Sequence, residues 1–537
     1  MTDASTGGTG GSDTGALVTA ARSQHLADLL HRTARRRPDH RALVHDDGVD
    51  TFAELDAVVT RVASAMSGRG VEQGDRVVVF AHNSRDFVVF YFALARLGAI
   101  SVPANFMLGA DELAYIVEHA QPVGYVVEDV LADVMRDAWV SAMGDATPRL
   151  AGWIASPDGP ARPDDHLDVA SLEDEGDDTA PEVVIGDDDV IQIMYTSGTE
   201  SRPKGVTLTS RMLIAQYVSC IVDGDMTADD VEIHSLPFYH CAQLHCFLTP
   251  DVYVGATSVV LPSPDPERIC EAIERERATK LFCPPTVWIS LLRSEAFERH
   301  DLSSLRKGYY GASIMPLEVL RELGERLPQV DLRNFYGQTE MSPLATILQP
   351  HEQVTKAGSA GVAALNVETR VVDDDDRPVA VGEIGEIVHR SPQATTGYWN
   401  DPEKTAETFR NGWFHSGDLG VLDEDGYLTI VDRKKDMIKT GGENVASKEV
   451  EDCLFQHPAV AEVAVFGTPD PRWIEAVTAC VVLRAGESVD DGELIAFARE
   501  RLAGYKTPKH LHVVDELPKN PSGKILKRDL RTRYADA

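Results

Sequence analysis

One short loop combines glycines, hydroxyl side chains and a lysine directly after an apolar run at residues 190–195. It spans residues 196–205 and reads TSGTESRPKG. Glycines let backbone N–H groups approach an anion, and Lys204 can offset phosphate charge, so the loop is suited to phosphate binding. It is not a Walker loop, because Gly205 stands after the lysine, where a Ser or Thr would hold magnesium. Alone, such a loop is equally consistent with a plain turn.

Two further segments carry groups that suit a nucleotide. In NFYGQTE at residues 334–340, Tyr336 offers a ring face for adenine, Thr339 a hydroxyl for phosphate and Glu340 an oxygen ligand for magnesium. In WFHSGD at residues 413–418, Asp418 follows a glycine turn and can accept hydrogen bonds from ribose hydroxyls. Each segment by itself would more often be an ordinary turn, so neither decides the function alone.

Two His-Cys dipeptides, at residues 240–241 and 245–246, suggest a zinc site. Neighbouring residues on a helix point in different directions, so the dipeptides would splay apart instead of surrounding one ion. A zinc site is therefore disfavoured, and we interpret His240 as part of a substrate pocket.

The order of these segments resembles the adenylate-forming superfamily, which contains acyl-CoA synthetases, beetle luciferases and nonribosomal adenylation domains. Within it the chain is most similar to bacterial fatty-acid CoA ligases. Residues 26–117 also resemble the N-terminal region of that superfamily, so the resemblance covers nearly the whole chain. The motifs that carry it, in chain order, are YTSGTESRPKG, LPFYH, NFYGQTE, GEI with GYW, WFHSGDLG, DRKKD, KTGGENV and LPKNPSGKILKRDL.

The resemblance implies an AMP-forming carboxylic acid:CoA ligase that uses ATP, Mg²⁺ and coenzyme A. It implies magnesium binding by Glu340 and Thr199, and catalytic roles for Glu340, His240, Lys435 and Lys524. Lys524 would bridge the carboxylate and the α-phosphate, where a cation stabilises the charge gathered in the transition state. The residues assigned to ATP are Thr196, Ser197, Gly198, Thr199, Lys204, Ala312, Ser313, Asn334, Tyr336, Gly337, Thr339, Asp418 and Arg433.

The charged stretch DRKKD predicts a surface connection between two domains, because charges packed so densely rarely lie in a core. The resemblance implies that the small domain delivers Lys524 for adenylation and then swings to present its glycine loop to the pantetheine thiol. We place the pivot at Lys435 and the CoA contacts at Lys439, Gly441 and Gly442.

The residues expected around the acid indicate an apolar, uncharged substrate. Relatives that adenylate amino acids carry an Asp just after an aromatic residue to pair with the substrate ammonium, whereas here Tyr239 is followed by His240. No clear cation is available for a second carboxylate. We therefore expect a fatty acid first and an aryl acid second. The predicted acyl-pocket residues are Tyr239, Cys241, Trp288, Tyr309, Gly311 and Pro343, with Phe238 and Leu344 beside them.

Two other functions stay open. One is a stand-alone adenylation enzyme that loads an acyl or aryl acid onto a carrier protein, although the KTGGENV segment favours free CoA. The other is a non-catalytic nucleotide- or acyl-binding homologue, suggested by Glu200 and Ser201, where the superfamily usually has Thr-Gly. A carboxylate near a triphosphate is unfavourable unless it points to solvent or pairs with Arg202. The presence of Lys524 and Glu340 counts against this alternative.

Short apolar runs alternate with helical patterns, which predicts parallel sheets covered by helices. We expect an α/β fold with a large N-terminal domain of sheets covered by helices and a small, mobile α+β C-terminal domain. The expected strands lie at residues 76–80, 190–195, 258–261 and 280–283, and the expected helices at 52–68, 111–119 and 265–276. The expected division is a disordered tail 1–23, an adenylation domain 24–431, a hinge 432–435 and a swinging domain 436–537.

Composition narrows the partners and the compartment. The formal net charge of -35 is opposite to what binding of nucleic acid or an anionic membrane requires. The apolar segment 87–102 is interrupted by Arg96 and Gly98 and falls short of the ~20 residues of a membrane helix. Seven cysteines without a CxxC pair, and an N-terminus unlike a signal peptide, predict a cytoplasmic protein. The expected partner is a small-molecule carboxylic acid, and a homodimer or a carrier protein stays open.

Overall fold

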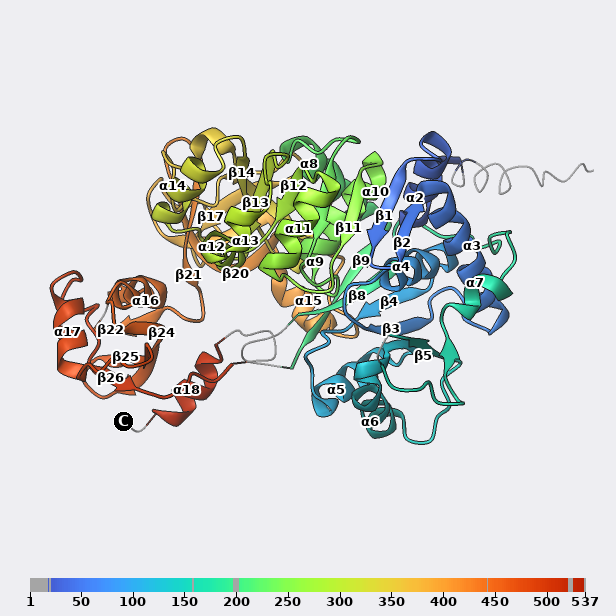
Figure 1. Cartoon of the computed structure of the whole chain (residues 1–537). Coiled ribbons are helices and arrows are strands. Elements are labelled where there is room, and N and C mark those ends of the chain that lie inside the picture. Colours follow the sequence, from blue (N-terminus) through green and yellow to red (C-terminus); the bar gives the residue numbers. More distant parts are fainter. Residues whose placement is uncertain are drawn as a thin grey trace, which may run out of the picture.

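The computed structural model describes residues 18, 21–156, 159–196, 202–441, 443–519 and 525–535. A large N-terminal body is followed, beyond strand β21 (Leu428–Arg433), by a smaller C-terminal body (Figure 1). Both contain helices and sheets, which confirms the predicted α/β class with one large and one small domain. The predicted tail lies mostly outside the described residues, and Val18, Ala21 and Arg22 near its end are helical.

The largest sheet has a parallel centre, in which β10, β12, β13 and β14 run in the same direction. In spatial order its strands are β16 (Val362–Ala363), β15 (Leu344–Leu348), β14 (Asp331–Gly337), β13 (Lys307–Gly311), β12 (Lys280–Phe282), β10 (Val231–His234), β11 (Thr257–Val260), β1 (Arg41–His45) and β2 (Gly48–Thr51). The helices packed on its outer face are α11 (Pro266–Glu276), α12 (Pro285–Arg293), α13 (Ala296–Arg299) and α14 (Leu317–Arg326). Its inner face meets α8 (Ser210–Asp223) and the π-helix η2 (Leu244–Leu248).

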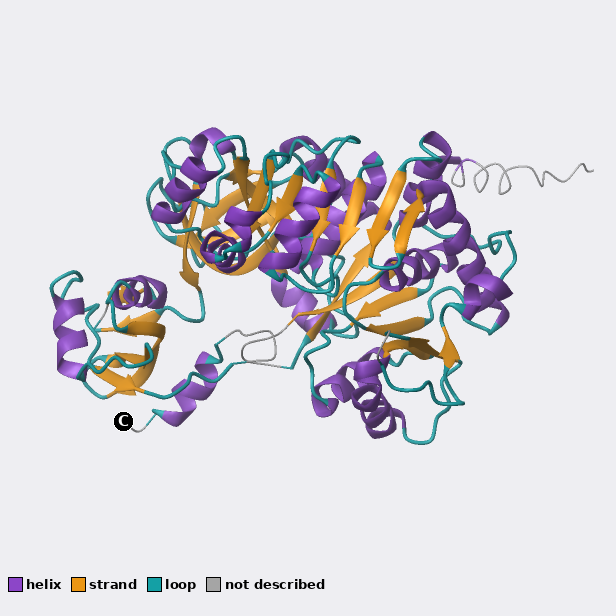
Figure 2. Cartoon of the chain, in the orientation of Figure 1, coloured by secondary structure: helices purple, strands orange, loops and turns teal. Residues whose placement is uncertain are grey.

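A second sheet lies beside the first, with helices on both faces (Figure 2). In spatial order its strands are β7 (Leu167–Asp168), β6 (Leu150–Ile154), β5 (Gly124–Glu128), β3 (Arg76–Phe80), β4 (Ile100–Pro103), β8 (Val190–Thr196) and β9 (Lys204–Thr209). Its helices are α2 (Leu26–Arg36), α3 (Phe52–Gly68), α4 (Arg85–Leu97) and α7 (Ser171–Glu175) on one face, and α5 (Ala110–Ala120) and α6 (Ala132–Met143) on the other.

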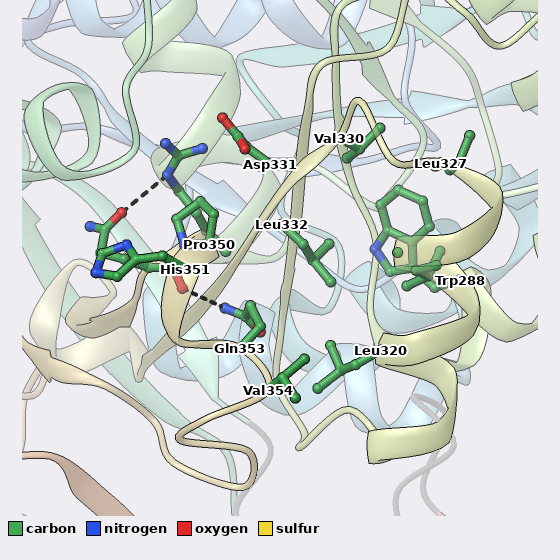
Figure 3. Close-up of a pocket in the computed structure, with 14 residues that line it drawn as sticks. Trp288, Leu320, Leu327, Val330, Asp331, Leu332, Pro350, His351, Gln353 and Val354 are labelled. Carbon is green, nitrogen blue, oxygen red and sulfur yellow. Dashed lines mark hydrogen bonds between the residues drawn. The ribbon is translucent and has the colours of Figure 1, made fainter.

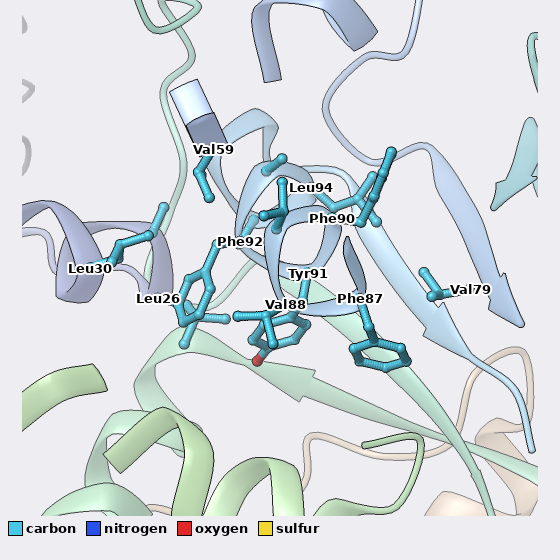
Figure 4. Close-up of a cluster of buried hydrophobic side chains, with 14 of the residues drawn as sticks. Leu26, Leu30, Val59, Val79, Phe87, Val88, Phe90, Tyr91, Phe92 and Leu94 are labelled. Atoms are coloured by element: carbon cyan, nitrogen blue, oxygen red, sulfur yellow. The ribbon is translucent and has the colours of Figure 1, made fainter. Parts of the chain in front are cut away.

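Helix α4 shows how the sequence builds this core. Ser84 caps its N-terminus by accepting a hydrogen bond from Phe87 N at 3.1 Å. Gly98 ends it in the left-handed conformation, with φ of 66°, which glycine adopts without strain. The helix is apolar on almost every side because it is buried among α2, α3 and the sheet (Figure 4). It leads into β4, so the apolar segment 87–102 forms a buried helix followed by a strand.

Two smaller sheets flank the connection between the bodies. The third sheet contains β17 (Glu368–Val372), β18 (Gly385–Arg390), β20 (Trp413–Leu422), β19 (Phe409–Arg410) and β21. The C-terminal body contains β23 (Glu443–Val445), β22 (Ile438–Thr440), β25 (Ile474–Leu483), β24 (Val460–Asp470) and β26 (His510–Val513). Its helices are α16 (Ser447–Phe455), α17 (Asp491–Arg499) and α18 (Lys527–Arg533).

The first two residues of the predicted hinge at 432–435 lie in a strand. Asp432 and Arg433 still belong to β21, where they pair with Leu419 and Asp418 of β20. Their charges are accommodated because Asp432 accepts a hydrogen bond from Ser447 N at 2.5 Å and Arg433 forms an ion pair. The turn that leaves the sheet therefore starts at Lys434.

The other predicted elements are confirmed with small shifts. The expected strands correspond to β3, β8, β11 and β12, and the expected helices to α3, α5 and α11, with ends that differ by at most one residue. Among the described residues, no helix is both long and apolar enough to cross a membrane.

Candidate active site

The C-terminal ends of β10, β13 and β14 bring three predicted segments to one edge of the largest sheet. Ligands in α/β folds bind where parallel strands end. Loop 235–240 with His240 follows β10, Ala312 follows β13, and segment 338–340 follows β14. Cys241 Sγ lies 3.2 Å from Thr339 Oγ1, so the first and third of these segments touch.

Glu340 is the centre of a contact group that also involves β9 and the segment after β18. The hydroxyl of Tyr398 donates to Glu340 Oε1 at 2.9 Å, and Thr395 N donates to the Glu340 carbonyl at 2.7 Å. The Lys204 ammonium lies 5.3 Å from the centre of the Tyr398 ring. Partial burial lowers the pKa of Lys204, while Glu340 opposes that shift. Tyr398 was missed as a site residue, although the GYW motif contains it.

The predicted magnesium ligands can be tested only at Glu340, because Thr199 lies outside the described residues. Glu340 Oε1 accepts the Tyr398 hydroxyl, and the carboxylate keeps a second oxygen for a ligand. A carboxylate oxygen close to a lysine that can hold phosphate is a suitable donor for Mg²⁺, which is bound by one or two carboxylates together with substrate phosphates. The residue present therefore fits this ion.

A second contact group lies where β14 faces β20 and β21. Tyr336 donates its hydroxyl to Asp418 Oδ2 at 2.7 Å, and Arg433 Nε lies 2.7 Å from Asp418 Oδ1. Burial and the neighbouring Asp418 carboxylate raise the pKa of Tyr336 well above its usual range, so its hydroxyl stays a donor. The structure thus unites three residues predicted to bind ATP. Asp418 can accept hydrogen bonds from ribose hydroxyls only if Tyr336 and Arg433 leave its oxygens or share them with the ribose.

His240 is exposed and caps the short helix α9 (Cys241–Gln243). Its Nδ1 accepts a hydrogen bond from Ala242 N at 3.2 Å. Because this nitrogen acts as the acceptor, a neutral ring carries its proton on Nε2. His240 can therefore donate a hydrogen bond to an anionic group in front of it.

The loop after β13 begins beside β14, the strand that carries Tyr336 of the second contact group. Ala312 has φ of 65° and is exposed together with Ser313. Gly311 is required before them, because a Cβ there would lie 2.5 Å from the Phe335 carbonyl oxygen. At Gly337 a Cβ would lie 1.7 Å from the Pro343 carbonyl oxygen. Both glycines therefore allow β13, β14 and the following turn to approach closely.

Asn334, also predicted to bind ATP, is buried and donates from Nδ2 to the Ser359 carbonyl at 3.3 Å. Its amide is thus directed at a neighbouring backbone group. A direct contact between Asn334 and ATP stays a prediction.

The predicted acyl-pocket residues lie on both faces of the largest sheet. The Tyr309 ring packs on the inner face with Phe247, Phe282 and Phe335, at centroid distances of 5.1 Å to Phe247 and 5.3 Å to Phe335. Its hydroxyl donates to the Gly224 carbonyl at 2.7 Å. These four rings form a packed wall behind the His240 loop, which we call the aromatic wall.

Trp288 is a correction to that prediction. It packs on the outer face of the sheet among α11, α13 and α14, opposite to the Tyr309 ring. Neighbouring side chains along a strand alternate between the two faces of a sheet, so Tyr309 and Tyr310 lie on opposite faces. Trp288 packs on the face that carries Tyr310. Figure 3 shows Trp288 instead at a cavity of about 550 Å³ with Leu320, Leu332 and Gln353.

Three predicted site residues of the phosphate loop and two of the C-terminal body cannot be placed. Thr196 is the last residue of β8, and its Oγ1 lies 3.5 Å from the Lys204 carbonyl oxygen. The predicted residues outside the described part of the chain are Ser197, Gly198, Thr199, Gly442 and Lys524.

The remaining predicted CoA residues lie in the C-terminal body. Lys439 N donates to Glu475 Oε2 at 2.6 Å, and Gly441 N donates to the Trp473 carbonyl at 2.8 Å. Gly441 has φ of 61°, and a Cβ there would lie 2.9 Å from the Trp473 ring. This turn therefore depends on glycine. Lys435 lies in the turn that follows β21.

The two His-Cys dipeptides have different surroundings. His240 is exposed at the site, whereas His245 is buried and hydrogen-bonded to Tyr217 and Gln192. Cys246 Sγ accepts a hydrogen bond from Gln216 Nε2 at 3.4 Å. The side chains of the two His-Cys dipeptides therefore point toward different partners, in agreement with the splaying expected on a helix.

Comparison with known proteins gives two family matches. The model described as "AMP-binding enzyme" matches residues 30–399, and the model described as "AMP-binding enzyme C-terminal domain" matches residues 449–524. A feruloyl-CoA synthase of Amycolatopsis sp is 38% identical, covering 96% of this chain and 100% of its own. An indoleacetate–CoA ligase of Aromatoleum aromaticum is 36% identical, covering 95% and 98%. The solved structure of a Mycobacterium tuberculosis fatty acyl CoA synthetase superposes with a TM-score of 0.76 at 31% identity, covering 95% and 98%.

Proposed function

Because the chain belongs to the AMP-binding enzyme family, as an AMP-forming acyl-CoA synthetase of the adenylate-forming superfamily, we propose that it converts an apolar, uncharged carboxylic acid to its CoA thioester at the site around Glu340. Enzymes of this kind use ATP, Mg²⁺ and CoA. A carboxylate oxygen attacks the α-phosphorus and pyrophosphate leaves. The CoA thiol then loses its proton and attacks the acyl carbonyl, and AMP leaves.

The contact groups of the site support the adenylation step. Lys204 offsets charge on the phosphates, and Asp418 with Arg433 holds the ribose beside Tyr336. Bound Mg²⁺, held by Glu340, would neutralise phosphate charge and orient the leaving group. His240 donates from Nε2 toward the carboxylate and the developing adenylate. Preorganised donors of this kind lower the barrier because they need no reorientation during reaction.

The second half-reaction is assigned to the C-terminal body. We place the pivot at Lys435, immediately after β21, and the pantetheine contacts at Lys439 and the glycine turn with Gly441. The sequence assigns the α-phosphate cation to Lys524. Lys524→Ala should abolish acyl-AMP formation yet largely spare thioester formation from supplied acyl-AMP. Equal loss of both half-reactions would contradict the division of labour between the domains.

The aromatic wall is the observation that carries the choice of acid. Tyr309 is completely buried, and its hydroxyl donates to the Gly224 carbonyl, so the wall is tightly packed against Leu236 of the His240 loop. A tightly packed aromatic wall favours a short or planar acid over a long flexible chain. The names of the feruloyl-CoA and indoleacetate–CoA relatives are consistent with this choice. We therefore place an aryl or arylalkyl acid first.

A fatty acid, the first choice from sequence, becomes the second candidate. It is favoured by the likeness to the fatty acyl CoA synthetase structure. Transfer to a carrier protein instead of free CoA is the third alternative, although the relatives named as CoA enzymes favour CoA. The cysteines of the described residues are free and buried, which supports a reducing, cytoplasmic location.

The test uses purified protein, MgATP and matched panels of aryl, arylalkyl and saturated fatty acids, with and without CoA. We expect acid-dependent pyrophosphate release, acyl-CoA formation when CoA is present, and the highest kcat/KM with an aryl or arylalkyl acid. Preference for long saturated chains would overturn the choice of acid but keep the ligase. Pyrophosphate release without acyl-CoA would favour a carrier protein, and no release with any acid would reject the enzyme.

A further inference from the structure

Beneath the His240 loop, four titratable side chains are sealed completely from solvent. Glu232 and His234 come from β10, Lys280 from β12, and Asp251 from α10 (Thr249–Val254). The Lys280 ammonium lies 2.8 Å from Glu232 Oε2 and forms a closer ion pair with Asp251 Oδ1. We call Glu232, His234, Asp251 and Lys280 the sealed cluster.

A metal ion is not needed to explain the sealed cluster. Glu232, His234 and Asp251 have the spacing of metal ligands, but the ammonium of Lys280 already contacts both carboxylates. Burial raises the pKa of Glu232 well above its usual range, whereas Lys280 lowers that of Asp251. Burial lowers the pKa of His234. The Lys280 ammonium thus pairs with the Asp251 carboxylate inside the cluster, which limits the cost of enclosing charges.

His234 connects this cluster to the short helix that begins at His240. Gln243 Oε1 accepts from Leu236 N at 3.4 Å, so the amide nitrogen of Gln243 donates to His234 Nδ1 at 2.7 Å. His234 then carries its proton on Nε2, which lies 3.4 Å from Asp251 Oδ2. Polar contacts thus run from Lys280 to Gln243, and the link between His234 Nε2 and Asp251 Oδ2 is a close approach without hydrogen-bond geometry.

Gln243 and Asn83 together hold the backbone of the loop that carries His240. Asn83 donates to the Leu236 carbonyl at 2.7 Å and accepts from Phe238 N at 2.8 Å. Both amides are buried, so their hydrogen bonds do not compete with solvent. Gln243 fixes the other polar group of Leu236, its N–H. The loop is therefore held from both sides before it reaches the exposed imidazole of His240.

We propose that Gln243 and His234, anchored by the sealed cluster, are positioning residues that fix the placement of His240 in the adenylation reaction. This inference rests on the proposed role of His240. Neither residue touches the substrate in this account. Their effect on the rate passes through the position of His240, and small misplacements of a reacting group can cost up to about 10²-fold in rate.

The test is a double-mutant cycle between Gln243→Met and His240→Ala. Methionine keeps the volume of Gln243 but removes its amide. We expect Gln243→Met to lower kcat for acid-dependent pyrophosphate release at least about tenfold, with KM for ATP little changed. In the His240→Ala background the same substitution should change kcat less than about twofold, because residues that act through one group are not additive.

Gln353→Met is the matched control. Gln353 is also buried, donates to the Leu348 carbonyl at 3.0 Å and accepts from the Tyr310 hydroxyl, but it lines the outer cavity of Figure 3. Its substitution should lower stability without coupling to His240. Equal effects of Gln243→Met in both backgrounds, or wild-type activity of His240→Ala, would overturn the inference. If Gln243→Met does not fold, Gln243→Asn, which keeps the amide but shortens it, enters the same cycle.

A second readout does not depend on activity. In histidine-labelled protein, the ring resonances of His240, assigned by their loss in His240→Ala, should shift in Gln243→Met and stay unchanged in Gln353→Met. Unchanged His240 resonances in Gln243→Met would reject the positioning role even in an active enzyme. Shifted resonances in a protein inactive toward every acid would instead retain the positioning and reject the proposed function.

Discussion

Two polar networks in the N-terminal body differ in their exposure to solvent, because one is fully buried and the other only in part. The sealed cluster of Glu232, His234, Asp251 and Lys280 is fully buried, and its contacts join strands and helices. The open network lies at the ends of the strands, and its Arg433 side chain is 47% exposed. We define it as Lys204, Tyr336, Glu340, Tyr398, Asp418 and Arg433.

The difference separates two uses of charge. Buried partners have no replacement from water, so removing one leaves an uncompensated charge and destabilises the fold. Partners at the open site can exchange one another for phosphate, ribose or magnesium. We therefore expect the sealed cluster to determine stability and geometry, and the open network to determine ligand binding and rate.

The largest expected effect is the loss of folding stability in the variant Lys280→Met. It leaves Asp251 buried without its cation and should lower the free energy of unfolding by about 3–5 kcal/mol. Denaturant titration of the wild type and variant measures this change. In Lys280→Met/Asp251→Asn the loss should be smaller than in the single variant. A loss below about 1 kcal/mol in Lys280→Met would remove the distinction between the networks.

Lys204→Met should show the reverse pattern. Loss of a cation from the phosphate site should lower the adenylation rate by about 10²–10³. The free energy of unfolding should change by no more than about 0.5 kcal/mol, because the lysine is only partly buried. Pyrophosphate release and denaturant titration on the same preparation check both values. Large destabilisation would place Lys204 with the sealed cluster.

A pH dependence of stability follows from buried His245. Burial lowers the pKa of its imidazole to about 3, from about 6.5 in an unfolded chain. The neutral imidazole of His245 therefore makes its full contribution to the free energy of unfolding above pH 6.5. This contribution is lost as the pH falls toward 3, because in that range only the unfolded state gains the proton. Between pH 6.5 and 5 this amounts to about 2 kcal/mol. In parallel unfolding titrations, the free energy of unfolding of His245→Gln should fall by that much less on acidification than that of the wild type. Identical pH profiles of the two proteins would contradict this role of His245.

The smallest effect is expected for Tyr336→Phe. The variant loses a hydrogen bond to the Asp418 carboxylate, worth about 1.5 kcal/mol, but retains the ring. KM for ATP should rise by up to about tenfold and the free energy of unfolding should fall by about 1.5 kcal/mol, while the rate at saturating ATP stays close to the wild type. A fall in kcat with unchanged KM would show that the hydroxyl acts in the chemical step instead.

Local sequence signals predicted the elements better than the faces on which side chains lie. Helix α3 and strand β3 follow directly from their patterns, and α4 is recognisable from its apolar length with Ser84 and Gly98 at its ends. Trp288 was misplaced because nothing in the local pattern distinguishes the two covered faces of a buried parallel sheet. Tyr398 was overlooked because its partner Glu340 is distant in sequence.

The sealed cluster was absent from the sequence interpretation for a related reason. Glu232, Asp251 and Lys280 stand in separate elements, and each alone resembles an ordinary surface charge. Only the pairing of β10 with β12 and the packing of α10 bring them together. By contrast, Tyr336, Asp418 and Arg433 were predicted together, because the motifs that contain them carry the family resemblance.

The most direct test of the central claim follows the oxygen atoms of the acid. The accepted acid, labelled with ¹⁸O in both carboxylate oxygens, is incubated with enzyme, MgATP and CoA, and the products are analysed by mass spectrometry. Attack of the carboxylate on the α-phosphorus predicts AMP that carries one ¹⁸O, unlabelled pyrophosphate and a thioester that retains the other ¹⁸O. Unlabelled AMP, or label in the pyrophosphate, would contradict an acyl-adenylate intermediate at this site.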